Sequence, residues 1–142
     1  MTEQARKPIY SPLQVGAATL LAGPMGGTHL LWANFNSLGK LHEAKITVAV
    51  GVSITALLLI FSFASASKAN FGMPIAVALV LGARYIAENH QLKKEAITDS
   101  VEYAVRSNWN VFWISVAWLA VILVIVILIS SVSTLLGFNA TS

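Results

Sequence analysis

The sequence contains no cysteine, which excludes disulfide bonds, thiol nucleophiles and cysteine metal sites. Charge is also scarce: Asp, Glu, Lys and Arg make up 11% of the chain, whereas a soluble domain carries about 25%. So few charged side chains cannot cover a water-facing surface of ordinary size. The net charge of +3 contains no basic run longer than a pair, so nucleic acid is not an expected partner.

Apolar residues take the place of the missing charge. They make up 56% of the chain, the mean hydropathy is +0.73, and long uncharged tracts separate the charged clusters. A transmembrane helix needs about 20 largely apolar residues, so this length allows one compact unit of three or four such helices. We therefore predict an all-α integral membrane protein, in which residues 1–142 form a single membrane domain, a bundle of 3–4 transmembrane helices.

Four hydrophobic segments carry this prediction. The second lies between Lys45 and Lys68, the fourth follows Arg106, and neither contains a charge, so both are predicted to span the bilayer. The third is shorter and contains Arg84, which we expect to extend toward the membrane surface or to pair with Glu88 one turn later. The four segments cover residues 12–38, 46–66, 70–88 and 110–132.

The first segment is interrupted by a cluster of helix-breaking residues: Gly23, Pro24, Gly26 and Gly27. It forms either one kinked helix or two half-helices, and the half before the break is about 16 Å long, too short to cross a bilayer alone. A re-entrant hairpin is therefore the alternative to a kink. A kink would let neighbouring helices pack closely, whereas a broken helix can line a path for ions or substrates. Packing is favoured because no acidic residue lies nearby to hold a cation.

The most polar stretch, residues 91–106, has helical periodicity. Apolar side chains fall on one face of such a helix and charged ones on the opposite face. We expect a short amphipathic helix at the cytoplasmic membrane surface, with an ordinary solvated helix as the alternative. The two faces consist of Ile97, Val101, Ala104 and Val105 and of Glu95, Asp99, Glu102 and Arg106.

The distribution of Lys and Arg predicts the orientation in the membrane, because basic residues gather on the cytoplasmic side. We compared three topologies: four crossings, a first segment that forms a hairpin, and a third segment that does not cross. All three place residues 84–106 in the cytoplasm and the C-terminus outside, while the side of the N-terminus stays open. The expected location is a bacterial inner (cytoplasmic) membrane, where the chain is multi-pass.

Few residues are candidates for chemistry. His29 is the titratable group that lies well inside the first segment, where it could relay protons or pack as a neutral imidazole. Packing is favoured because no carboxylate is placed to complete a relay. His42 and His90 lie near Glu43 and Glu88, but their spacing matches no standard metal site. We expect no metal and no other cofactor.

Asparagine and tryptophan gather where segments are expected to enter the bilayer. An aromatic belt and helix capping at the membrane interface explain both residue types, so we predict no further role for them. They are Asn34, Asn36, Asn108 and Asn110, with Trp32, Trp109 and Trp113.

The chain lacks a Ser-His-Asp set, a di-iron pattern and a phosphate-binding glycine loop, so we expect no enzyme. Three or four spans, short loops and no catalytic residues make its layout similar to that of immunity proteins, which protect bacteria from pore-forming toxins. This resemblance covers the whole chain in size and layout, and it carries over no site residues. It implies a function through helix–helix contact with another membrane protein. An accessory subunit of a membrane complex would act through the same kind of contact. The alternative is an oligomeric channel or transport component that uses the break at residues 23–27.

Overall fold

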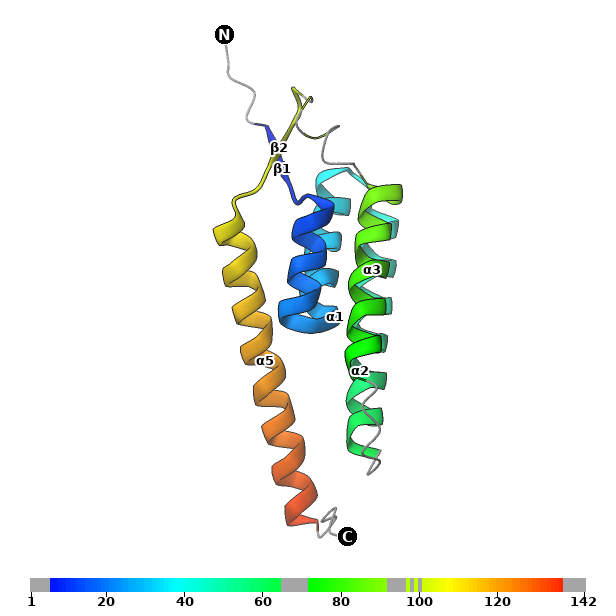
Figure 1. The fold of residues 1–142 in the computed structure, drawn as a ribbon, viewed down its shortest axis with the longest axis vertical. Coiled ribbons are helices and arrows are strands. Elements are labelled where there is room, and N and C mark those ends of the chain that lie inside the picture. The colour runs from blue at the N-terminus through cyan, green and yellow to red at the C-terminus, as the bar shows by residue number, and fades with distance from the viewer. Residues whose placement is uncertain (1–5, 65–71, 92–96, 98, 100, 137–142) are drawn as a thin grey trace.

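The computed structural model describes residues 6–64, 72–91, 97, 99 and 101–136. Four helices make up most of this part of the chain, and two short strands lie together at one end of the bundle (Figure 1). The four predicted segments are confirmed as helices, although the second begins at Leu41 rather than at residue 46. In chain order the elements are β1 (Lys7–Ile9), α1 (Pro12–Ser37), α2 (Leu41–Ala64), α3 (Gly72–His90), β2 (Tyr103–Val105) and α5 (Asn108–Leu135).

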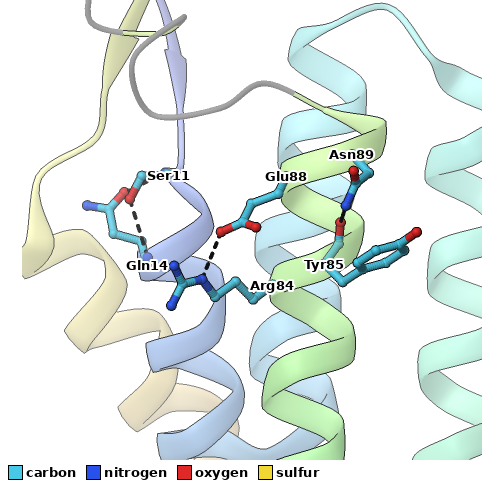
Figure 2. Close-up of polar contacts among 6 residues, drawn as sticks. All are labelled: Ser11, Gln14, Arg84, Tyr85, Glu88 and Asn89. Carbon is cyan, nitrogen blue, oxygen red and sulfur yellow. Dashed lines mark hydrogen bonds and ion pairs between the residues drawn. The ribbon is translucent and has the colours of Figure 1, made fainter.

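The first helix begins at a capping box, in which the side chain of each of two residues accepts a hydrogen bond from the backbone N–H of the other (Figure 2). The backbone N–H of Gln14 donates to Ser11 Oγ at 3.3 Å, and the backbone N–H of Ser11 donates to Gln14 Oε1 at 2.9 Å. Pro12 occupies the first turn, where its missing N–H costs no hydrogen bond. Local sequence therefore fixes where α1 starts, directly after β1.

Helix α1 is a hairpin of two half-helices. Ala22 (φ −119°, ψ 16°) and Gly23 (φ 64°, ψ −160°) leave helical geometry, and Pro24 follows the turn. The first half runs away from the strands, and the second half runs back toward them (Figure 1). The left-handed φ of Gly23 is strained for a residue with a Cβ atom, which explains glycine at the turn. The kinked-helix interpretation is therefore wrong, and the chain forms the hairpin.

Two further glycines let the halves of the hairpin touch. A Cβ atom added to Gly26 would lie 2.4 Å from the carbonyl oxygen of Ala18. One added to Gly27 would lie 2.0 Å from Oγ1 of Thr19. Both distances are far below van der Waals contact, so the backbone at Gly26 packs on the backbone of the other half and the backbone at Gly27 packs on the Thr19 side chain.

The hairpin is also the centre of the bundle, because α2, α3 and α5 each pack mainly on α1. The core residues lie on both halves of α1 and on the helix faces turned toward it: Val15, Ala18, Leu30, Leu31, Ala87 and Val111. Since the hairpin turns back at Gly23, it accompanies the longer helices over only part of their length (Figure 1).

Two of the helices are long and apolar enough to cross a membrane, within the described part of the chain. They are Leu41–Phe63 of α2, with a mean hydropathy of 2.4, and Asn108–Leu135 of α5, with 3.0. Only 6% of each apolar window is buried inside the protein. The core helix of a soluble protein would be mostly covered, so these two helices expose their apolar side chains instead.

The predicted amphipathic helix over residues 91–106 is wrong at its C-terminal end. Strand β2 is extended there and pairs in parallel with β1. The predicted apolar face does not form, because Ile97 is 1% exposed whereas Val101 is 85% exposed. The fold is thus not purely helical. The remaining part of that prediction, residues 92–96, 98 and 100, lies outside the described residues.

Candidate functional site

Buried hydrogen bonds hold the open end of the hairpin. Asn34, which is 1% exposed, donates from Nδ2 to the carbonyl oxygen of Tyr10 at 2.8 Å and accepts at Oδ1 from the backbone N–H of Tyr10 at 2.7 Å. The same Nδ2 donates to Gln91 Oε1 at 2.8 Å, and Gln91 Nε2 donates to the carbonyl oxygen of Leu31 at 2.9 Å. These bonds tie the second half of α1 to Tyr10, just before the first half, and to the chain that leaves α3.

A second group of hydrogen bonds joins α1 to the beginning of α5. Gln14 Nε2 donates to the carbonyl oxygen of Arg106 and to Asn108 Oδ1, both at 2.7 Å. Arg106 Nη1 donates to the Tyr10 hydroxyl at 3.0 Å, and that hydroxyl donates to Asn110 Oδ1. The guanidinium also lies 5.4 Å from the centre of the Tyr10 ring, within cation–π range. We call this set the polar clasp: Tyr10, Gln14, Asn34, Gln91, Arg106 and Asn110.

The two strands extend the polar clasp toward solvent. The backbone N–H of Lys7 donates to the carbonyl oxygen of Glu102 at 2.8 Å, and that of Arg106 donates to Ile9 at 2.9 Å. The Lys7 ammonium and the Glu102 carboxylate form an exposed ion pair at 2.9 Å. Their hydrogen bond and mutual attraction lower the pKa of Glu102 and raise the pKa of Lys7. An exposed pair of this kind contributes little to global stability, so its effect is local to the two strands.

The fold brings the predicted residues at the helix break together, and the glycines among them allow the turn and the close packing of the hairpin. Gly23 makes the turn, whereas Gly26 and Gly27 are buried against the other half of α1. Pro24 lies on the side of the turn that faces α2 and α3, where it lines a groove. This cluster is therefore explained by packing.

The remaining predicted residues lie apart from the break. His29 contacts two indole rings, Trp32 at 5.7 Å and Trp118 on α5 at 6.2 Å between ring centres, which favours the packing role. Arg84 Nε and Glu88 Oε1 form the predicted ion pair between residues four apart, at 2.8 Å. Figure 2 shows this pair on the side of α3 that points toward α1.

An apolar groove of about 430 Å³ runs between α2 and α3. The second half of α1 forms its floor, and the two helices form its walls. Its lining is mostly aliphatic or small, with three threonines and Phe35, and the titratable Glu43 and His90 lie at one end. Lys40 is beside that end, because its Nζ donates to the carbonyl oxygen of His90 at 2.9 Å. The groove walls include Val50, Gly51, Ile54, Ala78, Leu79 and Gly82.

Within the described residues, no three His, Cys, Asp or Glu side chains are placed to hold a metal ion. The polar clasp consists mainly of amides and backbone groups that bond to one another, and such groups position helices. Comparison with known protein families, with curated proteins and with solved structures finds no match.

Sequence reasoning missed the polar clasp. Asn34, Asn108 and Asn110 were explained by capping and the membrane interface, yet Asn34 is buried between chain segments. The available signal was the presence of uncharged polar residues, Gln14 and Asn34, inside the first apolar tract. Such residues need hydrogen-bond partners when they are buried, and that need could have indicated a turn that brings them together.

Proposed function

We propose that the chain is a multi-pass membrane protein without catalytic activity, which acts by contact between its helices and another membrane protein. The observation that carries this proposal is the exposed apolar surface of α2 and α5, whose apolar windows are 6% buried. A continuous apolar surface of this extent is unfavourable in water, so we infer that lipid and a partner protein surround it.

In this proposal α2, α3 and α5 cross the bilayer, and α1 enters and leaves from the same side. Helix α3 has 19 residues. It is about 28 Å long, close to the hydrocarbon thickness of about 30 Å, and it crosses only with Arg84 and Glu88 in its last turns extended toward the cytoplasmic surface. Each half of α1 is too short to cross, and the packed halves cover each other's backbone, as a re-entrant segment requires.

The hairpin also supports an orientation. Strand β1, the end of α3 and the start of α5 all lie at the end of the bundle that holds the polar clasp, the clasp end (Figure 1). In that topology eight of the nine basic residues belong to one side, and only Lys68, between α2 and α3 in the sequence, belongs to the other. The positive-inside rule then places the clasp end in the cytoplasm, which supports a bacterial inner-membrane location.

The contact role has two forms that the sequence predicted, immunity to a membrane-inserting toxin and service as an accessory subunit. A channel or transport role has less support. An ion path needs polar groups along it, whereas the groove beside the hairpin turn is apolar and the glycines of the break pack against the hairpin's other half.

Site-specific photo-crosslinking in living cells tests the contact role. We would place a photoreactive amino acid at three exposed positions, one each on α2, α3 and α5: Leu57, Val77 and Leu123. The proposal expects one of these faces to give a discrete adduct with one membrane protein, while the other faces label lipid. Labelling of lipid alone from all three helices would contradict it.

A further inference from the structure

We propose that the groove between α2 and α3 holds one acyl chain of a phospholipid, whose phosphate lies beside Lys40. This proposal rests on the membrane location proposed above, and it concerns a ligand rather than the protein partner. Three properties of the groove support it: the length of the groove, the polarity along it and the space inside it.

The length of the groove matches one leaflet of a bilayer. Its walls run from Glu43 to Ile54 on α2 and from His90 back to Ala78 on α3. Each stretch is about 16–18 Å long, close to half of the hydrocarbon thickness of about 30 Å. Helix α2 continues to Ala64, but the groove does not, because its floor ends where the hairpin turns. A transmembrane helix from another protein would need a groove of about twice this length.

The polarity of the groove matches an amphiphile. The lining is mainly apolar, with the hydroxyls of Thr19, Thr28 and Thr47 as its uncharged polar groups. Charged groups are found at the clasp end alone among the lining residues described. The Lys40 ammonium has three donors, one of which goes to the carbonyl oxygen of His90, so the others can meet a phosphate. Glu43 lies at the same end and suits a headgroup that also carries an amine. A phospholipid with an ethanolamine head has both charges.

Small residues keep the groove open. Ala78 and Gly82 lie one turn apart on the α3 wall, and a Cβ atom added to Gly82 would meet no atom within 4 Å. Gly51 on the opposite wall behaves differently, because a Cβ atom there would lie 2.0 Å from Oγ1 of Thr28. Gly51 thus contributes to helix packing, whereas Gly82 borders free space in the groove.

The experiment is native mass spectrometry of the full chain, purified in a mild detergent after reconstitution into vesicles of phosphatidylethanolamine and phosphatidylglycerol. We expect the wild-type protein to retain one phospholipid while its surrounding lipids are washed away. Ala78→Phe and Gly82→Phe fill the groove, so each should lower the retained fraction roughly tenfold, a loss of about 1.4 kcal/mol in binding free energy. Lys40→Gln should also lower the retained fraction, because it removes the ammonium group that is proposed to bind the phosphate.

Val77→Phe is the matched control, since Val77 neighbours Ala78 on α3 but is 50% exposed outside the groove. It should retain lipid like the wild type, and all variants should keep the wild-type circular dichroism and melting temperature. A wild-type protein that retains no lipid, or equal retention in Ala78→Phe, would overturn the proposal. So would a groove-dependent adduct with a protein or a second copy of the chain. Membrane fractionation separates these outcomes from a failure of the membrane location itself.

Discussion

Among single residues of the polar clasp, Asn34 is the most deeply buried side-chain amide. It bonds to both backbone groups of Tyr10 and to Gln91, and it is fully enclosed. Asn34→Ala would leave a buried N–H and a buried carbonyl of Tyr10 without these bonds. We expect it to lower the free energy of unfolding by about 1–3 kcal/mol, measured by titration with a denaturing detergent.

The matched control for this substitution is Asn89→Ala. Asn89 is exposed, and its Nδ2 donates within its own helix to the carbonyl oxygen of Tyr85 at 2.9 Å. Its replacement should change stability by no more than about 0.5 kcal/mol. Equal losses in Asn34→Ala and Asn89→Ala would mean that the clasp does not hold the hairpin.

The three glycines of the hairpin differ in the reason for their sensitivity to alanine. Gly26→Ala should cost about 1–3 kcal/mol, because the Ala18 carbonyl in its way is backbone and cannot rotate aside. Gly27→Ala should cost less, since it meets a threonine side chain. Gly23→Ala has free space but a left-handed φ, which costs about 1–2 kcal/mol.

Gly82→Ala serves as the control for these substitutions, because no atom lies near its added Cβ. It should be neutral or stabilise the protein by up to about 1 kcal/mol through helix propensity. Melting temperatures in detergent for the four variants measure this ranking. If Gly26→Ala melts with or above Gly82→Ala, the close packing of the two halves is incorrect.

The pairing of β1 with β2 should weaken in acid. The pKa of Glu102 is lowered in the folded state, so its contribution to stability is present above the unfolded pKa and is lost as pH falls through the folded value. The pKa of Lys7 is raised, so its contribution is lost only at high pH. Amide exchange of Lys7, whose N–H donates to Glu102, should therefore accelerate as pH falls below the usual range of a carboxyl, after correction for intrinsic rates. In Glu102→Gln this acceleration should disappear.

The helices could be predicted from the sequence, whereas the way they meet could not. Long uncharged runs determine α2 and α5 locally, and helix breakers mark residues 23–27, although they do not distinguish a kink from a hairpin. That choice depends on the conformation of Gly23 and on contacts such as Tyr10 with Asn34. The strands escaped prediction because each has 3 residues and their partners lie about a hundred positions apart. The short amphipathic pattern over residues 91–106 predicted a helix where β2 lies.

At the scale of the whole molecule, the hairpin bears on the proposed number of crossings and hence on the sides of the termini. In the proposed topology α1 enters and leaves from one side and three helices cross, which predicts that the two ends of the chain lie on opposite sides. A fluorescent protein fused to the N-terminus should be bright in the cytoplasm. At the C-terminus it should be dark, and alkaline phosphatase there should be active. Termini on the same side would contradict the hairpin topology.

The polar clasp also implies an order of events during synthesis. Tyr10 and Asn34 can meet as soon as the hairpin is made, but Gln91 and Asn110 leave the ribosome much later. At about 5–20 residues per second, the Tyr10 hydroxyl waits on the order of 5–20 s for its partner on α5. Because α2, α3 and α5 each pack mainly on α1, the segment made first supplies the surface on which every later helix packs. The last helix to be made completes the hydrogen bonding at the start of the first.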